Sequence, residues 1–442
     1  MNEVQKNVVA SSKGFLHPIR RLPTEILQQI FEECTNAEAA EWFLDPTRPP
    51  SPLKSATRIA GTCRSWRTIA QQTPRMWNRL RAPIQVESRN YKTVGREAFC
   101  NSLQLCGSIP LEVTIPSMVS NLEQFNFTSL KIDRLNFYDI RYDFYDWTTH
   151  PWRRISFPSP RHLWAGNGDC DYPYTRMLPS SLISRTTTIT AHNITVTIPE
   201  GSNRVTQLVL CGLQDTFKLT SLLKSLPCLT ELDAGAVVVC NHREQDHRAL
   251  THQKLKHLRI PISCMRALEE YLAGGLQLPS LNCFGLANHS ASGRMRYDPL
   301  HYTPSAFPSV SAQFSTTVTH LEVHREYAVT TSSTSSLIET FYKVDTISTY
   351  GSAVRVILRA LCRTGDMPEG EKASEKESLP SSIQALHIHD YLGDGEDLYP
   401  ALYKIYNDTM PIKIFFENCP NILPTTRREF THMGTAASRP SH

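Results

Sequence analysis

The sequence contains no run of apolar residues that approaches the roughly 18 needed to cross a membrane as a helix. Its first twenty residues have only a short apolar stretch at residues 8–10, so they lack the hydrophobic core of a secretory signal peptide. Charge of one sign is not in excess, because 46 Lys and Arg residues stand against 42 Asp and Glu residues. The resulting net charge of +4 is too small to indicate nucleic-acid binding. We therefore expect a soluble protein of the cytoplasm or nucleus, with neither a membrane nor a nucleic acid as partner.

The twelve cysteines include no Cys-x-x-Cys pair. In a chain of 442 residues without a signal peptide, we interpret them as small apolar residues in a reducing compartment. A run of Cys and His residues at 240, 242, 247, 252 and 257 has five-residue steps, which do not place side chains on one helical face. We interpret this run as a solvated linker and expect neither a metal site nor a cofactor.

Familiar catalytic motifs are also absent: the sequence has no GxSxG elbow, GxxxxGK[ST] phosphate loop, GxGxxG or HExxH. We therefore expect a protein that is not an enzyme. Active sites can be assembled from distant positions, so an enzyme on an α/β domain is the less favoured alternative. That alternative predicts a concave pocket in which ionisable groups converge and have strongly shifted pKa values.

The clearest pattern near the N-terminus is a set of apolar residues at four-residue steps. Leu22, Ile26 and Ile30 form one row of a predicted helix, and Leu27 and Phe31 form the next. A proline directly after Leu22 suits the first helical position, where its missing N–H costs nothing. This segment therefore predicts an amphipathic helix.

A second helix is predicted by Ile59, Cys63, Trp66 and Ile69, with a proline-rich loop at 45–52 before it. Pro74 ends this helix, and a short third element follows at residues 76–80. Two or three short helices cannot enclose all of this apolar surface. The rest of the chain or a partner helix must cover what remains.

These segments resemble the F-box, and in particular the F-box-like domains of many fungal proteins. The resemblance rests on Leu22-Pro23-x-Glu25, then Cys63-Arg64-x-Trp66, and a closing Trp77. Thr62 departs from the valine usual in the family, and the proline-rich insertion is longer than in the shortest F-boxes. Residues 109–115 also resemble the PLxLxI strand that follows the box in those fungal proteins.

The resemblance implies the substrate-recognition subunit of an SCF-type ubiquitin ligase, which binds a Skp-family adaptor and through it a cullin. It implies that the following residues contact the adaptor or pack beside that contact: Leu22, Pro23, Ile26, Leu27, Ile30, Cys63 and Trp66. Residues 53–81 hold seven basic residues and no acidic one, which would favour docking to an acidic adaptor. The alternative is that these charges form an ordinary solvated face.

After residue 115 the chain repeats a hexad of the form apolar-x-x-apolar-x-apolar. Hexads begin at 132, 152, 205, 255, 318 and 383, with partial versions at 229 and 278. The steps 205→229→255→278 fit leucine-rich repeats, although the remaining spacing is irregular. The fourth and sixth residues of a hexad should face the core, and the third, fifth and seventh should face solvent. Segments 216–226 and 265–276 have helical spacing and would form an outer layer.

The solvent-facing positions form a surface rich in Arg and His. We expect this surface to bind a target protein, and its Arg and His content would suit an acidic or phosphorylated one. Exposed strand faces are also often polar for no special reason, and unrelated strands of an α/β domain are the alternative to a repeat array. The candidate target-binding residues are Arg134, Arg154, His257, Arg259, His320, His324 and His387.

The predicted fold class is α plus α/β, a small helical F-box module followed by an irregular leucine-rich-repeat-like solenoid. The predicted organisation is a flexible N-terminus (1–17), the F-box-like domain (18–82), a degenerate leucine-rich-repeat-like domain (83–424) and a flexible tail (425–442). Residues 330–336 and 366–380 are predicted to be exposed loops. The first alternative in function is a non-catalytic interaction scaffold without a role in ubiquitination.

Overall fold

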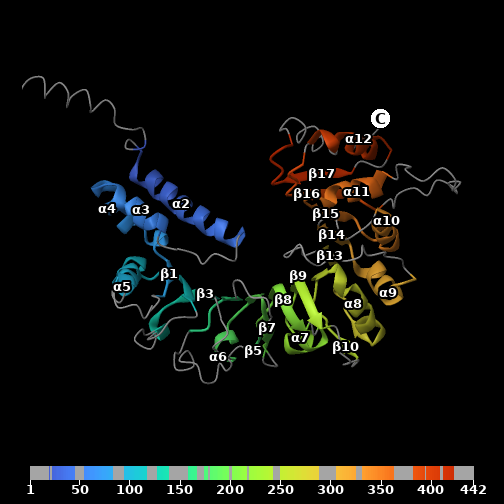
Figure 1. Cartoon of the computed structure of the whole chain (residues 1–442), viewed down its shortest axis with the longest axis horizontal. Helices are drawn as coiled ribbons and strands as arrows, with labels where there is room; N and C mark the ends of the chain where they lie inside the picture. The colour runs from blue at the N-terminus through green and yellow to red at the C-terminus, as the bar shows by residue number, and fades with distance from the viewer. Residues whose placement is uncertain are drawn as a thin grey trace, which may run out of the picture. The chain divides into compact units, whose positions relative to one another are not determined.

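The computed structural model divides into two compact units, an N-terminal unit (Met1–Cys170) and a C-terminal unit (Asp171–His442) (Figure 1). Among the helices it describes, none is both long and apolar enough to cross a bilayer. The structure describes residues 19, 22–44, 54–82, 94–116, 127–138, 158–166, 174–177, 180–198, 202–216, 219–241, 249–287, 305–324, 331–362, 382–393, 395–408 and 412–422. The predicted flexible ends at 1–17 and 425–442, and the loops at 45–52 and 366–380, fall outside these residues.

The N-terminal unit begins with three α-helices: α2 (Thr24–Leu44), α3 (Lys54–Thr62) and α4 (Arg64–Gln71). Helix α2 confirms the first predicted helix, with Pro23 accepting the Leu27 N–H bond from just outside it. The prediction of one continuous second helix was wrong, because the chain forms two helices there, α3 and α4. Cys63 is extended (φ −159°, ψ 170°), and its Sγ accepts a hydrogen bond from the Trp66 N–H at 3.5 Å, so it caps α4 and ends α3.

The helices pack around a small apolar core. Phe31 is buried on α2, and its ring lies 4.9 Å from that of Trp66 on α4. The 3₁₀ turn η2 (Pro74–Met76) then brings Trp77 under α4, where its Nε1 donates to the Ala70 carbonyl at 2.7 Å. A buried indole needs such a partner, so this bond fixes how the chain leaves the helices.

A parallel sheet starts directly after these helices. Strand β1 (Arg79–Arg81) pairs with β2 (Leu111–Pro116), β2 with β3 (Ile132–Tyr138), and β3 with β4 (His162–Gly166). Helix α5 (Val94–Cys106) packs against β1, and the turn η4 (Phe127–Ser129) precedes β3. The boundary predicted at residue 82 therefore falls inside one compact unit, because β1 belongs to both the helical segment and the sheet.

The C-terminal unit alternates strands and helices. Its main sheet has strands in chain order and all neighbours parallel. The strands are β6 (Thr188–His192), β8 (Gln207–Thr216), β9 (Glu231–Asn241), β11 (His257–Pro261), β13 (Cys283–Ala287), β14 (His320–His324), β15 (Thr346–Tyr350), β16 (Ala385–His389) and β17 (Lys413–Glu417). Two small parallel pairs accompany it, β5 (Tyr174–Met177) with β7 (Ile194–Thr197) and β10 (Leu250–Thr251) with β12 (Leu276–Gln277).

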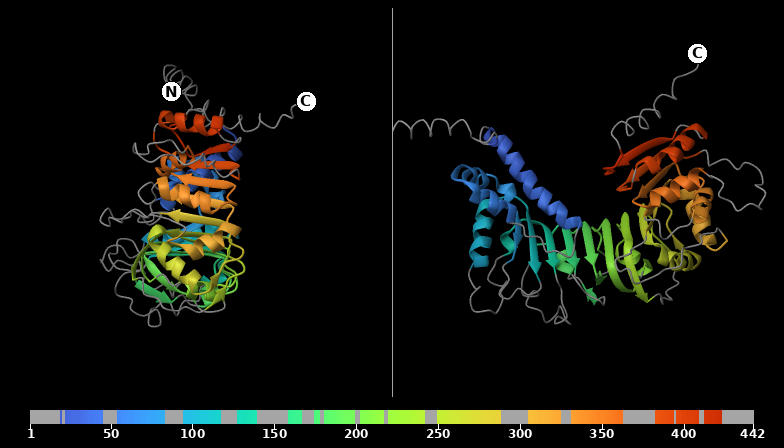
Figure 2. Two further views of the ribbon diagram at one scale, coloured as in Figure 1. Left: turned by 90° about the vertical axis from the view of Figure 1, so that its right-hand side faces the viewer. Right: turned by 45° about the horizontal axis from the view of Figure 1, so that its top comes forward.

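Helices connect successive strands and lie along one side of strands β11 to β17 in Figure 2. They are α6 (Ser180–Ile183), α7 (Leu219–Ser225), η6 (Ile262–Cys264), α8 (Met265–Ala273), α9 (Pro308–Thr317), α10 (Thr331–Thr340), α11 (Ala353–Cys362), η8 (Gly395–Asp397) and α12 (Tyr399–Asp408). Helices α7 and α8 confirm the predicted outer segments. Helix α10 contradicts the loop predicted at 330–336, because its buried Thr334, Leu337 and Ile338 give it a packed face.

Hexad burial follows the prediction at most described strands. The fourth and sixth residues are buried in β11 (Leu258, Ile260), β14 (Leu321, Val323) and β16 (Leu386, Ile388). Two fifth-position residues were wrongly placed in solvent: Asn136 and Glu322 are both buried. The hexad beginning at residue 152 lies outside the described residues.

One hexad frame was also wrong. Register pairs Leu258 with Phe284, so the repeat on β13 reads Leu281-x-x-Phe284-x-Leu286, three residues after the predicted frame at 278. The corrected step from Leu255 to Leu281 is 26 residues, the same as the step from 229 to 255. Regularity in this part of the sheet is therefore higher than the sequence pattern alone indicated.

Phe284 tests how far this core depends on interlocking aromatic rings. It is buried between Phe314 and Phe341, with ring centroids 5.0 and 6.2 Å away. Replacing Phe284 with Ala should lower the free energy of unfolding by about 3–5 kcal/mol, because the cavity cannot fully collapse. Urea denaturation followed by circular dichroism measures this loss. Leu392→Ala, at a largely exposed leucine, is the control and should change stability by less than about 0.5 kcal/mol.

Candidate functional site

The first candidate surface lies on the helices of the N-terminal unit. Ile26 is 41% exposed and Pro23 is also exposed, whereas Leu22, Ile30, Cys63 and Trp66 are half-buried. Leu27 is only 4% exposed. The sequence left adaptor contact and internal packing open for all seven residues. Burial shows that Leu27 packs inside the chain, whereas the other six keep exposed surface.

The half-buried Trp66 shows how one residue can both pack in the core and leave surface for a partner. The Trp66 ring packs at a tilt against the buried Phe31, while the residue as a whole remains partly exposed. Ile26 and Ile30 are one helical turn apart on α2 and so share a face. The partly covered apolar side chains near these two helices are the kind of surface that a partner helix covers.

Some basic residues of this module are exposed, whereas others form contacts within the fold. Lys54, Arg58 and Arg64 are exposed. Arg79 instead serves the fold: it donates to the Thr35 carbonyl at 2.7 Å and lies 3.5 Å from the Glu112 carboxylate. The predicted electrostatic docking can therefore use the exposed residues of α3 and α4, but not Arg79.

The second candidate surface is the strand face of the C-terminal unit that carries the odd hexad positions. Register places the fifth positions side by side in what we call the central row. Its members are Asp233, Arg259, Gly285, Glu322, Ser348, His387 and Phe415.

Arg259 forms ion pairs with two other members of this row. Its guanidinium lies 2.8 Å from Asp233 on one side and 2.7 Å from Glu322 on the other. Glu322 is two strands away, and the strand between them carries Gly285 at the matching position. A Cβ at Gly285 would come within 2.9 Å of the Arg259 Cγ and 3.2 Å of the Glu322 carboxylate. Glycine therefore provides the space through which the ion pair forms.

The cluster is electrostatically coupled. Burial would raise the pKa of Glu322, but the adjacent imidazoles of His257 and His324 and the charge of Arg259 outweigh it and hold that pKa well below its usual range. Burial would likewise lower the pKa of Arg259, but the carboxylates of Asp233 and Glu322 outweigh it and raise that pKa. Both groups are therefore charged, and two carboxylates oppose one guanidinium.

This neutralisation corrects the expectation of an acidic or phosphorylated ligand at Arg259. Its guanidinium already pairs with two carboxylates, so an added anion would meet their repulsion. His257 faces the same carboxylate, with its Nε2 3.3 Å from Glu322 Oε2. The Arg259 cluster therefore favours a cation over an anion.

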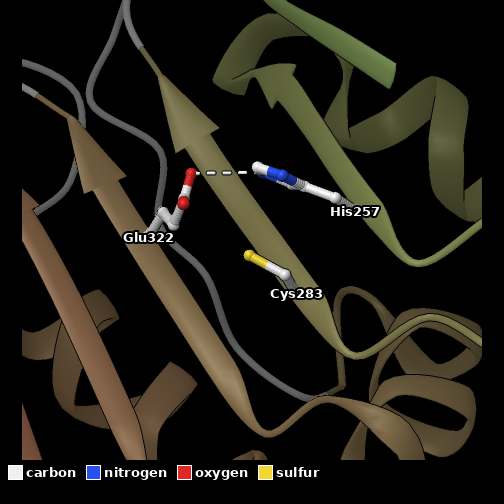
Figure 3. A group of neighbouring side chains, drawn as sticks. All are labelled: His257, Cys283 and Glu322. Atoms are coloured by element: carbon white, nitrogen blue, oxygen red, sulfur yellow. Dashed lines mark hydrogen bonds and ion pairs between the residues drawn. The ribbon is translucent and has the colours of Figure 1, made fainter. Parts of the chain in front are cut away.

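Figure 3 shows His257, Cys283 and Glu322 converging from three neighbouring strands. Their ligand atoms lie within 4.8 Å of one another. A cysteine beside a histidine and a carboxylate has the composition of a nucleophilic site. However, burial and then the charge of Glu322 raise the pKa of the Cys283 thiol, so it is not an activated thiolate. Ionisable groups do converge here, as the enzyme alternative required, but their chemistry does not favour nucleophilic catalysis.

Farther along the sheet, planar rings stack across strands. Tyr350 lies between His324 and His389, with ring centroids 3.8 and 4.5 Å away. His389 Nδ1 is 3.0 Å from the Glu417 carboxylate. In the central row His387 stacks on Phe415, a residue that is 38% exposed. These strands present an aromatic surface rather than a cationic one.

Burial lowers the pKa of His320, His324 and His387 and raises the pKa of Tyr350 to about 12. These rings are therefore neutral near pH 7. His320 is further engaged by the Ser348 hydroxyl at 2.8 Å. The histidines supply shape and hydrogen bonding rather than positive charge.

The predicted target-binding residues are thus only partly brought together. His257 and Arg259 meet at Glu322, with His320, His324 and His387 on the neighbouring strands. Arg134 lies on β3 in the other unit, and Arg154 lies outside the described residues. The predicted target-binding residues did not include Glu322, Cys283, Tyr350 or Phe415. Three of the four lie on β13, β15 and β17, whose hexads were not recognised, and register alone brings them into the rows.

The structure also tests part of the Cys/His run that was predicted to be a solvated linker. His252 is buried, with Nε2 3.0 Å from the Leu226 carbonyl and Nδ1 accepting the Leu255 N–H bond. It therefore ties two repeats together and is not part of a solvated linker. Residues 242 and 247 lie outside the described residues.

In a comparison with known families, residues 19–82 match the family described as F-box-like. The match covers α2, α3, α4, η2 and β1, which include the partly exposed apolar surface of the N-terminal unit. A search of curated proteins finds no match.

Arg259→Ala tests the buried ion pair. It leaves Glu322, only 8% exposed at its side chain, without its guanidinium, and should cost about 3–5 kcal/mol of unfolding free energy. Denaturant unfolding measures the cost. The exposed pair of Arg266 and Glu270 provides the control, because Arg266→Ala should cost less than about 1 kcal/mol. Equal costs for the two variants would contradict a structural role for Arg259.

His324 gives a pH-dependent prediction. Its folded-state pKa is lowered, so the unfolded chain takes up a proton below the usual value of 6.5 and the folded chain does not. Its contribution to stability is therefore present above about pH 6.5 and is lost as the pH falls below that value. His324→Phe keeps a ring to stack on Tyr350 and removes the titration. Melting temperature should fall less between about pH 7.5 and 5.5 in the variant than in the natural protein; parallel profiles would contradict this.

Proposed function

We propose that this protein is the target-recognition subunit of an SCF-type ubiquitin ligase. The single observation that carries the proposal is the coincidence of two features at residues 19–82: the F-box-like match and a helical surface whose apolar side chains are incompletely covered. F-box domains generally bind Skp-type adaptors, which connect them to a cullin. The protein itself then needs no catalytic residue.

In this proposal, α2 and α4 form the adaptor-binding surface. Ile26 and Pro23 contact the adaptor directly, and Leu22, Ile30, Cys63 and Trp66 border that contact. Leu27 and Phe31 support it from the core. Exposed Lys54, Arg58 and Arg64 favour association with an acidic adaptor through long-range attraction.

The C-terminal unit supplies the target-binding surface. Its parallel strands in chain order, each followed by a connecting helix or loop, fit a degenerate leucine-rich-repeat-like array in which neighbouring repeats share one core. The strands from β14 to β17 are the favoured contact region because Phe415 and the neighbouring neutral rings offer exposed aromatic area. Aromatic side chains are enriched where protein interfaces gain most of their binding energy.

Such a protein would act by proximity. Holding a target on one module while the other is bound to the ligase raises the effective concentration of target lysines near the ubiquitin-charged enzyme. We further propose that this takes place in the cytoplasm or nucleus, where such ligases work. The alternative is an interaction scaffold that binds the adaptor or a target without causing ubiquitination.

Ile26→Glu tests the adaptor surface. Placing a carboxylate at this apolar position should weaken co-purification of a Skp-family adaptor by about 30-fold or more, as expected for a central interface residue. Gln29→Glu adds the same charge at another exposed α2 position and is the matched control. Leu22→Ala combined with Pro23→Ala should weaken binding in the same direction.

Circular dichroism must show that both glutamate variants remain folded. Undiminished adaptor binding by folded Ile26→Glu would contradict the proposal. If the adaptor binds but no captured protein is turned over more slowly when this chain is depleted, the scaffold alternative is favoured.

A further inference from the structure

We propose that His257, Cys283 and Glu322 form a zinc(II) site on the strand face of the C-terminal unit. The three side chains come from β11, β13 and β14, which are adjacent and parallel. His257 and Cys283 occupy paired register positions, and Glu322 reaches them from the next strand (Figure 3). This site is independent of adaptor binding, since it lies wholly in the C-terminal unit.

The donor set suits zinc. Imidazole nitrogen, thiolate sulfur and carboxylate oxygen are its usual protein ligands, at bond lengths that place neighbouring donors about 3.3–3.6 Å apart in a tetrahedral site. His257 Nε2 and Glu322 Oε2 are already 3.3 Å apart. All three donor atoms lie within 4.8 Å of one another, so small side-chain rotations would complete the approach.

A fourth donor lies beside these three. His324 Nε2 is buried, 3.7 Å from Glu322 Oε2, and has no hydrogen-bond partner within the described part of the chain. A buried polar nitrogen without such a partner is costly, and binding a cation would offset that cost. The described geometry therefore offers three ligands and a fourth candidate for a tetrahedral ion.

Arg259 is the main opposing charge, because its guanidinium also contacts Glu322 Oε2. However, it has a second partner in Asp233 at 2.8 Å and can keep that ion pair while Glu322 turns toward a metal. Without metal, Asp233, Glu322 and Arg259 leave one negative charge. Loss of the Cys283 proton to solvent adds a second, which balances the two positive charges of zinc.

Cobalt(II) is a spectroscopic substitute for zinc that tests the site directly. Titrating the full chain with cobalt(II) should produce a thiolate-to-cobalt charge-transfer absorption that saturates at one ion per chain and disappears when zinc(II) is added. Cys283→Ser should abolish this absorption and weaken zinc binding by about 100-fold or more, since even outer-shell changes cost 10- to 100-fold. Cys228→Ser is the matched control, because Cys228 is also partly buried but lies outside the cluster.

Two further variants locate the ion. Arg259→Gln removes the competing charge and should tighten zinc binding by about tenfold or more. Glu322→Gln should weaken it by a similar factor. A melting curve without metal shows whether each variant is folded. No charge-transfer band in the natural protein, or a band that survives in folded Cys283→Ser, overturns the proposal.

Discussion

Parallel register is the constraint on which the C-terminal unit depends. Because each strand of the main sheet from β9 to β17 pairs in parallel with its neighbour and in chain order, equivalent hexad positions form continuous rows. The fourth and sixth positions supply a core that no single repeat could enclose. The odd positions are brought together on the other face, so residues as far apart in sequence as Asp233 and Glu322 contact the same guanidinium.

The same constraint explains why a buried charge is tolerated. Glu322 stands at a position that is normally solvent-facing, yet only 6% of its surface is exposed. Its cost is offset by Arg259, His257 and His324, and the pair forms across a glycine. Such a network specifies which strands lie side by side, since a register shift would leave a buried carboxylate without a cation.

Much of the organisation could be predicted from local pattern. The helical stripe of α2, the F-box-like segment and the core positions of the recognised hexads depend on neighbouring residues along the chain, and the sequence displays them directly. The break at Cys63 could not be predicted, because an apolar stripe continues across it and only the backbone conformation shows the cap. Helix α10 was missed because its polar composition hides three buried residues.

The sites were less predictable than the fold because they depend on pairing between strands. Nothing near residue 259 in the sequence shows that its charge is neutralised from residues 233 and 322. The aromatic surface was missed for the same reason, since β15 carries a threonine at its sixth hexad position and so concealed its repeat. Adaptor contacts were predicted as a group, and burial then separated Leu27 from the rest.

The contacts of Arg79 determine where the chain can be truncated to give a folded fragment. This side chain joins Thr35, in the middle of α2, to Glu112 on β2, and β1 itself pairs with β2. A fragment cut at the end of the F-box-like match would lose β2, which leaves both edges of β1 unpaired and the side chain of Leu80 uncovered. Sheet edges of that kind recruit other chains, so an excised module would be prone to aggregate, and the smallest well-behaved piece extends through the following strands.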